Sequence, residues 1–286
     1  MSATALEPEP FAVTRDGAEL AGEVIGEGAP LVLLHGLTAA RRYVVHGSKA
    51  LPRAGYRVLA YDARGHGESD PAPPRTGYSY PELAGDLSAV LDRVAGGHPA
   101  VLVGHSMGAH TLTALALAEP ERVAAMVAIG PVALATPPSA DSLTRWDALA
   151  DGLATGGVDG FLRAYERDLD PRWRETLLRI ARERLSIHRH PKAVARALRE
   201  VPRSEPFDDL AELEFCEVPA LVVASHDQAD PGHPYAVAEA WAARLPRAEL
   251  VSEEPGASPL AWQGGRLSRE IAAFCERPEV VERLRS

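Results

Sequence analysis

Short, continuous apolar runs alternate with longer amphipathic stretches over most of this chain. The apolar runs cover residues 30–36, 56–62, 99–106, 123–130, 219–227 and 248–253. Runs of this kind are typical of β-strands that are buried on both faces. The stretches between them have helical spacing, at residues 41–54, 81–95, 108–118, 234–244 and 265–276. The alternation predicts an α/β fold with a mainly parallel sheet flanked by helices, and ligands bind at the carboxyl ends of such strands.

Two segments depart from this alternation. Residues 11–26 form two short runs around Asp16-Gly17, a pair that suits the tight turn of a β-hairpin. Residues 134–210 have helical spacing and no strong strand candidate, and so long a connection without structure is rare in a compact domain. We therefore expect a helical cap over the strand ends. The predicted organisation is a core at 11–133 and 211–276, a cap at 134–210, and loose tails at 1–10 and 277–286.

One motif carries recognisable chemistry. Gly104-His105-Ser106-Met107-Gly108 is G-x-S-x-G, and it lies between an apolar run and a helical stretch. That context defines a nucleophile elbow, in which a sharp turn presents the serine hydroxyl above the sheet. The following helix points its amino terminus at the same place, which favours a developing negative charge. Ser106 is therefore the predicted nucleophile.

With two further motifs, the chain resembles the α/β-hydrolase superfamily over about residues 11–276. His35-Gly36-Leu37 is similar to the family's HG motif, and residues 62–69 (DARGHGES) are similar to its D-x-R-G-x-G-x-S segment. The resemblance implies an oxyanion hole made by two backbone N–H groups, which by position belong to Leu37 and Met107. It also implies that the histidines and the arginine of these two motifs support turns and take no part in catalysis.

The resemblance places the catalytic acid after the apolar run 219–227. Residues 224–231 are similar to the family's G-x-x-D-x-x-x-P, with Ala224 in place of glycine. This makes Asp227 the predicted acid. Asp230 is the alternative, although its place just before a proline also suits a residue that caps the following helix.

The family pattern fails at the catalytic base. A serine hydroxyl is a poor nucleophile until a base accepts its proton, and the family supplies a histidine after the last strand. Here the matching position holds Ala257 or Ser258, and His233 is the last histidine of the chain. His233 is one candidate for a substitute base, since it lies in the loop that carries both acid candidates. Further candidates are His46, His110, His188, His190 and, as carboxylates, Glu253 and Glu254.

The incomplete triad leaves two classes of function open. The first is hydrolysis of an ester or similarly activated carbonyl in a small molecule, with Ser106 as nucleophile. The second is a non-hydrolytic enzyme of the lyase or cyclase type, or a non-catalytic small-molecule binder, on the same scaffold. Function belongs to the site and not to the fold, so the fold alone does not decide between them.

The composition of the chain limits the kinds of molecule that we expect it to bind. A formal net charge of -10 without a basic stripe disfavours nucleic acid. The chain has no apolar run of about 18 residues, so we expect no membrane partner, and its start lacks the features of a signal peptide. Cys216 and Cys275 stand in no metal-binding spacing, which predicts reduced thiols and a cytoplasmic protein with no metal or organic cofactor. Aromatic residues of the expected cap favour an apolar or aromatic substrate: Trp146, Phe161, Tyr165 and Trp173.

Overall fold

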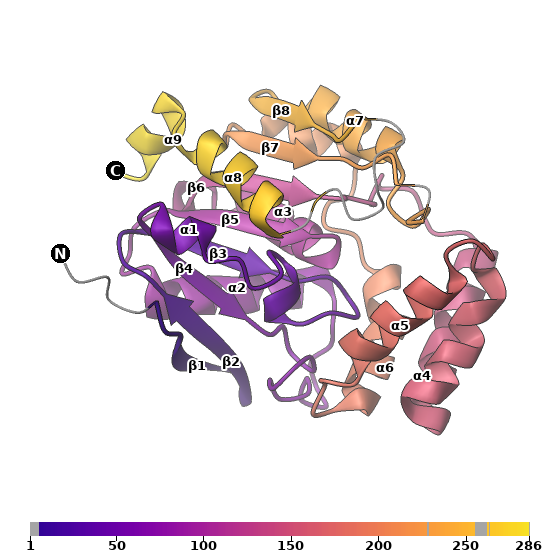
Figure 1. Ribbon diagram of the computed structural model, residues 1–286. Helices are drawn as coiled ribbons and strands as arrows, with labels where there is room; N and C mark the ends of the chain where they lie inside the picture. Colours follow the sequence, from indigo (N-terminus) through magenta and orange to yellow (C-terminus); the bar gives the residue numbers. More distant parts are fainter. Residues whose placement is uncertain (1–5, 228, 255–261, 263, 286) are drawn as a thin grey trace.

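The computed structural model describes residues 6–227, 229–254, 262 and 264–285, and its centre is one twisted sheet (Figure 1). The strands follow each other in the spatial order β1-β2-β4-β3-β5-β6-β7-β8. β1 and β2 form the expected hairpin, β2 pairs antiparallel with β4, and all later pairs are parallel. The mainly parallel sheet predicted from the apolar runs is therefore confirmed. The strands are Glu9–Arg15, Ala18–Ile25, Ala29–Leu34, Tyr56–Tyr61, Ala100–His105, Val123–Ile129, Ala220–Val223 and Ala248–Val251, numbered β1 to β8.

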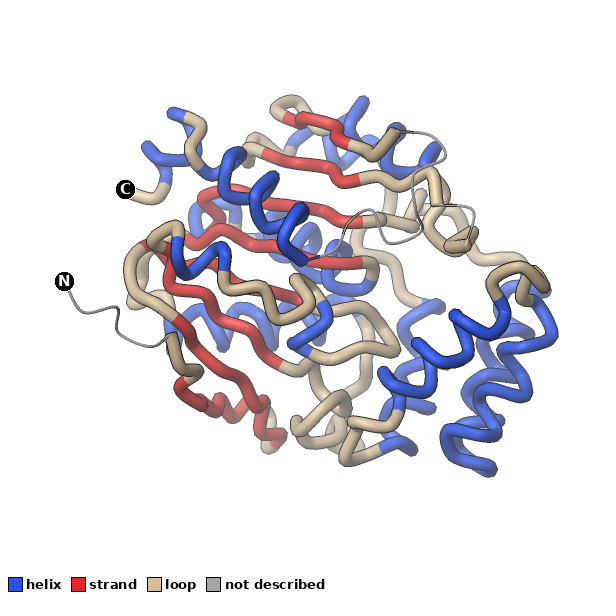
Figure 2. Tube along the Cα trace, in the orientation of Figure 1, coloured by secondary structure: helices blue, strands red, loops and turns tan. Residues whose placement is uncertain are grey.

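Helices cover both faces of the sheet (Figure 2). Alternate residues of each central strand point to opposite faces, so Val32 joins one apolar core with α2, α3 and α7, and Leu33 joins another with α1, α8 and α9. Cys216 belongs to the first core and Cys275 to the second, and both thiols are free. The helices of the two layers are α1 Ala50–Arg53, α2 Tyr80–Val94, α3 Met107–Ala118, α7 Tyr235–Arg244, α8 Gly264–Cys275 and α9 Pro278–Arg283.

Three helices interrupt the alternation between β6 and β7 and lie beyond the carboxyl ends of the strands (Figures 1 and 2). They are α4 Ala140–Tyr165, which is kinked at Gly157, α5 Arg174–Leu185 and α6 Pro191–Glu200. We use the name cap segment for residues 134–210, which contain them. Short 3-10 helices lie at Arg41–Tyr43, Pro120–Arg122, Glu166–Asp168, Val201–Arg203 and Leu210–Phe215.

Three local expectations were wrong. The stretch 41–54 is not one helix, because His46 and Gly47 have φ of +48° and +72° and break it into a 3-10 turn and the four-residue α1. The carboxyl-terminal residues are not a loose tail: α9 forms there, and Val280 is fully buried against the sheet. At the other end, β1 begins at Glu9, inside the expected amino-terminal tail.

Candidate active site

The serine of the G-x-S-x-G motif stands on a strained turn between β5 and α3. Ser106 has φ +52° and ψ -112°, a conformation that residues with side chains rarely adopt. The Ser106 N–H donates to the Ile129 carbonyl oxygen at 2.9 Å, which ties the turn to β6. A side chain at Gly104 would collide with the Gly108 backbone, and one at Gly108 would collide with the Leu34 carbonyl. Close packing thus requires both glycines.

The two backbone N–H groups expected to form an oxyanion hole flank this turn. Leu37 follows the end of β3, and Met107 is the first residue of α3. Within the part of the chain that the structure describes, neither N–H has an acceptor, and Ser106 Oγ makes no hydrogen bond either. The Leu37 carbonyl oxygen lies 2.6 Å from His66 Nε2, which fixes the loop. Both donors are therefore free for a ligand oxygen, and their catalytic role stays a prediction.

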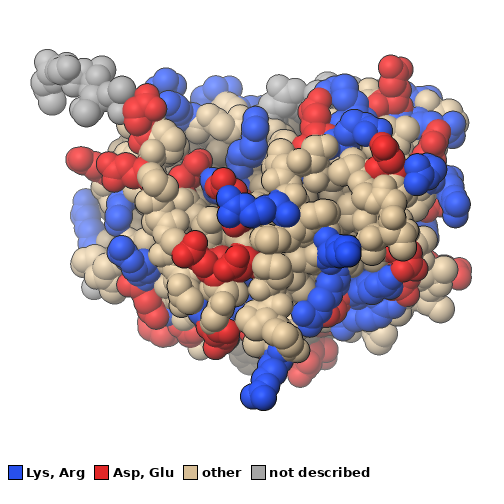
Figure 3. Space-filling model, turned by 90° about the horizontal axis from the view of Figure 1, so that it is seen from below, with Lys and Arg blue, Asp and Glu red and all other residues tan. Residues whose placement is uncertain are grey.

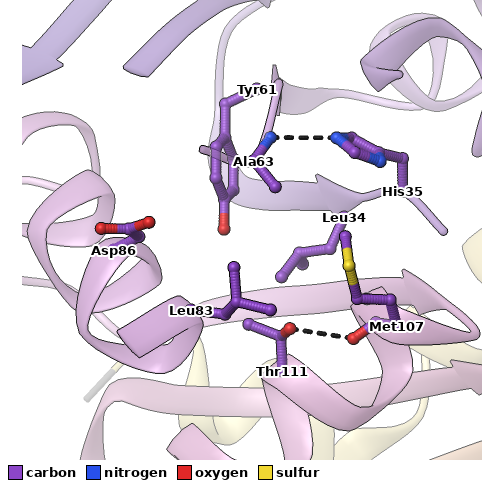
Figure 4. A pocket seen from close by; sticks show the side chains of 9 residues that line it. Leu34, His35, Tyr61, Ala63, Leu83, Asp86, Met107 and Thr111 are labelled. Carbon is purple, nitrogen blue, oxygen red and sulfur yellow. Dashed lines mark hydrogen bonds between the residues drawn. The ribbon is translucent and has the colours of Figure 1, made fainter. Parts of the chain in front are cut away.

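A small cavity lies behind the turn, between β3, β4, α2 and α3 (Figure 4). Its volume of about 10 Å³ is room for a single water molecule. The side chains of Tyr61, Leu83 and Met107 line it, and His35 Nε2 accepts a hydrogen bond from the Ala63 N–H at 2.9 Å. The cavity is too small for an organic substrate. Its surroundings support the turn from behind, and His35 is one of the supporting residues.

Asp227, the acid that the family spacing favours, has no histidine partner among the described residues. Its Oδ1 accepts a hydrogen bond from the Ala229 N–H at 2.8 Å. Burial raises the pKa of Asp227, and the charges of Asp230 and Glu253 raise it further against that hydrogen bond. The neighbouring His226 ring is instead stacked on Tyr235, with the ring centres 4.1 Å apart. Asp227 therefore lacks the contact that an orienting acid needs.

Asp230 and His233 do form such a contact. His233 Nδ1 lies 2.8 Å from Asp230 Oδ2, within the short loop between β7 and α7. The His233 ring lies 5.0 Å from the ring of His105, which directly precedes the serine, and it packs against Gly130 at the end of β6. The prediction that Asp230 caps the following helix is wrong, because α7 begins at Tyr235 and no side chain caps it. The loop thus brings the substitute base and the alternative acid together beside the turn.

The charges around this pair favour an ionised acid. Partial burial opposes ionisation of Asp230, but the hydrogen bond and charge of His233, with smaller effects from His105 and Arg184, lower its pKa. Burial, together with the charges of His233 and Arg184, lowers the pKa of His105 to about 3, so that ring is neutral. An ionised Asp230 is an acceptor only and orients the His233 ring through Nδ1–H.

Two of the other candidate bases, His110 and His188, make hydrogen bonds elsewhere in the fold. His110 is buried, with Nδ1 at 2.7 Å from the Tyr80 hydroxyl and Nε2 accepting from the Val132 N–H at 2.9 Å. His188 Nδ1 accepts from the Gly67 N–H at 2.8 Å. Both rings hold the fold together and have no lone pair free for catalysis. Among the remaining candidates, His46 lies in the turn before α1 and His190 directly precedes α6.

The carboxylate alternative to a histidine base loses support at Glu253. Its side chain accepts hydrogen bonds from Ser225 Oγ at 2.6 Å, the His226 N–H at 2.7 Å and Trp262 Nε1 at 3.0 Å. Burial alone would raise its pKa, but these hydrogen bonds lower it. A general base needs the opposite shift, so Glu253 fits a structural role. The position of the missing family histidine, Ala257 or Ser258, lies outside the described residues.

Two cap residues, Tyr165 and Arg184, are coupled electrostatically to this loop, and Tyr165 is among the cap aromatics expected to meet the substrate. Burial and the charge of Asp230 raise the pKa of Tyr165 at the end of α4, and the charge of Arg184 in the last turn of α5 helps to lower the pKa of Asp230. From the sequence, the row of cap arginines that contains Arg184 predicts a solvated helix face first and capture of an anionic substrate second; the row is Arg172, Arg174, Arg179, Arg182 and Arg184. The sequence carries no signal that separates this arginine from its exposed neighbours, because the direction of its side chain depends on how α5 docks.

Comparisons with known proteins define the class. The chain belongs to the alpha/beta hydrolase fold family, whose sequence profile it matches over residues 29–240. The resemblance inferred from the motifs is thereby confirmed. Among solved structures, a thermophilic esterase from Thermogutta terrifontis superimposes with a TM-score of 0.76 at 23% identity, covering 94% of this chain and 98% of that one. At that identity the likeness concerns the fold.

Two curated relatives extend the comparison. The chain is similar to a putative carbamate hydrolase, RutD, of Variovorax paradoxus, at 33% identity over 205 residues, which is 71% of this chain and 75% of the relative. It is also similar to a putative non-heme haloperoxidase of Mycobacterium phage D29, at 36% identity over 115 residues. That match covers only 40% of each chain.

The described residues contain no group of three or more His, Cys, Asp or Glu side chains arranged to hold a metal ion. Over the same part of the chain, no helix has the length and apolar character needed to cross a bilayer. On the face presented in Figure 3, acidic and basic side chains are interspersed. That face carries no continuous basic stripe of the kind that phosphate backbones require.

Proposed function

We propose that the protein is a serine hydrolase that cleaves an ester or related activated carbonyl of a small molecule, with Ser106 as nucleophile and His233 as base. The observation that carries this proposal is the hydrogen-bonded pair of His233 and Asp230 beside the strained serine turn. The family membership supports an enzyme, and the names of the curated relatives include hydrolases. They do not favour a lyase, a cyclase or a non-catalytic binder.

The mechanism uses the two nitrogens of His233 for different tasks. Nδ1–H donates to Asp230, which leaves Nε2 with a free lone pair. Nε2 accepts the proton as Ser106 Oγ attacks the carbonyl carbon, and it returns that proton to the departing alcohol oxygen. A water molecule then attacks the acyl-enzyme in the same way, which releases the acid and restores the serine.

The negative charge that forms on the carbonyl oxygen needs donors that are already in place. The N–H groups of Leu37 and Met107 have no acceptor among the described residues and flank the turn, which supports this role. Preorganised donors of this kind contribute about 3 kcal/mol each to lowering the barrier in other serine hydrolases. The amino terminus of α3 points at the same oxygen and adds to the stabilisation.

In this proposal Asp230 is the acid that orients the base, a role that the family spacing assigns to Asp227. His233 lies three residues after Asp230 in the loop between β7 and α7, and its Nδ1 is within hydrogen-bond distance of that carboxylate and not of Asp227. Asp227 remains the alternative acid.

The substrate is proposed to be apolar or aromatic in the part that meets the cap segment, where Tyr165 lies near the Asp230 loop. The two buried, unpaired thiols support a reducing, cytoplasmic setting. The chemistry as proposed requires no metal or organic cofactor.

The experiment that tests this function compares p-nitrophenyl ester turnover in wild type and four variants. We expect Ser106→Ala and His233→Ala to lower kcat by about a hundredfold or more, as loss of a nucleophile or a general base does. Asp230→Asn should also lower kcat, whereas the matched control Asp227→Asn should keep a kcat close to that of wild type. Loss of activity in Asp227→Asn but not in Asp230→Asn would mean that Asp227, at the family position, is the catalytic acid. Turnover that is equal in wild type and Ser106→Ala would reject the serine hydrolase.

A gain-of-function variant separates a relocated base from an absent one. Ala257→His restores the family histidine at its usual place. If His233 already acts as base, Ala257→His should add little to the wild-type rate but should partly rescue His233→Ala. A large gain in the wild-type background would instead mean that the native protein has no working base.

A further inference from the structure

A second cavity opens where the cap segment meets the core, and it is far larger than the one behind the serine turn. Its volume of about 470 Å³ is in the range of small-molecule binding sites. One wall is the loop between β4 and α2, and the other is the start of α6 with the residues just before it (Figure 1). We use the name seam groove for this cavity, which is lined by Pro71, Ala72, Tyr78, residues 189–193 and Arg196.

The residues that line the seam groove carry positive charge and, within the described part of the chain, no carboxylate. Lys192 is exposed and has no hydrogen bond or ion pair with any described residue. The side chain of Arg189 is 63% exposed, and its guanidinium lies 3.9 Å from the Glu68 carboxylate, at the outer limit of an ion pair. A hollow lined by charge of one sign raises the local concentration of ions of the opposite sign. The groove therefore favours an anion.

Arg196, by contrast, is already paired and fixes the shape of the groove. Its Nε donates to the Glu200 carboxylate at 2.5 Å, and its Nη2 donates to the Thr76 carbonyl oxygen at 2.7 Å. Glu200 also accepts a hydrogen bond from the Tyr78 N–H at 3.0 Å. These contacts join α6 to the core loop, so both walls are held in place. Because Glu200 neutralises Arg196, the charge available to a ligand is that of Arg189 and Lys192.

The floor of the seam groove is apolar. Ala72, Tyr78 and Ala193 are at most 7% exposed and belong to one apolar cluster. An inorganic anion would leave this floor uncovered, and a neutral apolar molecule would leave the two cations without a partner. The lining thus matches a molecule with an apolar body and an anionic group. Since Glu68 offsets part of the Arg189 charge, a single carboxylate matches the remaining charge.

We propose that the seam groove is a binding site for a small organic carboxylate with an apolar body, whose carboxylate meets Lys192 and Arg189. The cap segment supplies the cations and the core loop supplies part of the floor, so the bound ligand bridges the two. The groove shares no lining residue with the cavity behind Ser106, and its ligand is independent of the hydrolase function. A ligand that binds only the folded chain also raises its melting temperature.

The test compares probes that separate the two parts of the ligand. Calorimetry measures the affinity of wild type for 2-naphthoate, for the neutral 2-naphthylmethanol and for acetate, which lacks the apolar body. We expect 2-naphthoate to bind about five to ten times more tightly than 2-naphthylmethanol, as two exposed ion pairs permit. Acetate should bind at least tenfold more weakly than 2-naphthoate.

Variants then assign the binding to the seam groove. The double variant Arg189→Gln/Lys192→Gln should lose the preference for 2-naphthoate, and Lys192→Glu should reverse it. The control Arg53→Gln removes an exposed cation of α1 and should keep the preference, as should Ser106→Ala. The exchanged side chains of the groove are exposed, so each variant should keep the wild-type melting temperature without ligand.

Three outcomes would overturn the proposal. They are equal affinity of wild type for 2-naphthoate and 2-naphthylmethanol, a preference that persists in the double variant, and a preference that is lost in Ser106→Ala. The last two would place the probe at another site. Because no probe is an ester, these results do not depend on turnover, and an absence of esterase activity would reject the hydrolase alone.

Discussion

Lowering the pH should reduce the free energy of unfolding through His188, which links the cap segment to the core. This imidazole is 8% exposed, and its Nδ1 accepts the Gly67 N–H at 2.8 Å, while Nε2 lies 3.3 Å from the Thr38 carbonyl oxygen. The adjacent Arg189 N–H donates to the Gly67 carbonyl oxygen at 2.8 Å. A ring that accepts through Nδ1 must be neutral, so protonation removes the bond to Gly67.

The size of the effect follows from the difference in pKa between the folded and unfolded states. Burial, with the nearby charges of His66 and His35, lowers the pKa of His188 to about 3, whereas an unfolded chain titrates near 6.5. Between these values the unfolded state binds the extra proton, so the stability that neutral His188 provides is complete above pH 6.5 and is lost as pH falls toward 3. One pH unit corresponds to about 1.4 kcal/mol, which gives about 2 kcal/mol lost at pH 5.

The assay is the free energy of unfolding in urea at pH 7.5 and pH 5. His188→Asn keeps an acceptor near the Nδ1 position but does not titrate, so it should lose about 2 kcal/mol less than wild type between the two pH values. The control, His98→Asn, removes an exposed imidazole and should show the wild-type loss. Equal losses in wild type and His188→Asn would refute the reasoning, because other titrating groups are common to both proteins.

Two further substitutions test the support of the serine turn and of its surroundings. Gly108→Ala places a methyl group against the Leu34 carbonyl. We expect it to lower the free energy of unfolding by about 3 kcal/mol and to remove most of the labelling of Ser106 by a fluorophosphonate. An unchanged melting temperature and unchanged labelling would show that the turn tolerates a side chain. The carboxylate of Asp86 accepts hydrogen bonds of 2.5 and 2.6 Å from the buried guanidinium of Arg64, and Asp86→Ala leaves Glu82, at 3.3 Å, as the remaining carboxylate there. We expect this variant to lower the free energy of unfolding by about 3 kcal/mol, and a loss below 1 kcal/mol in urea denaturation would mean that Glu82 or water replaces the lost carboxylate.

Much of the fold follows from local patterns in the sequence. Continuous apolar runs gave the parallel strands, because a strand covered on both faces has no polar side. The glycines around Ser106 predicted the sharp turn. They are required there because the Gly104 backbone packs against Gly108, and Gly108 packs against the Leu34 carbonyl. The helical character of the cap segment was equally visible. These features depend on residues that are near each other in the chain or share one strand.

The features that sequence analysis missed depend on contacts that local patterns do not encode. The helix α9 is only six residues long, and it forms because Val280 finds a place against the sheet. The pairing of His233 with Asp230 depends on the path of an irregular loop, in which the His233 N–H also donates to the Asp230 carbonyl at 3.2 Å. The enclosure of the Arg184 Nε depends on the docking of α5. In each case the decisive partner is fixed only by the folded backbone.

The central claim is that His233 activates Ser106, and the most direct test is the rate at which a fluorophosphonate labels Ser106. Wild type should be labelled, Ser106→Ala should not, and His233→Ala should be labelled at least a hundredfold more slowly, because its serine has lost the base that accepts its proton. Thermal unfolding of the same samples shows that each variant is folded. Labelling of folded His233→Ala at the wild-type rate, or no labelling of wild type, would contradict the account.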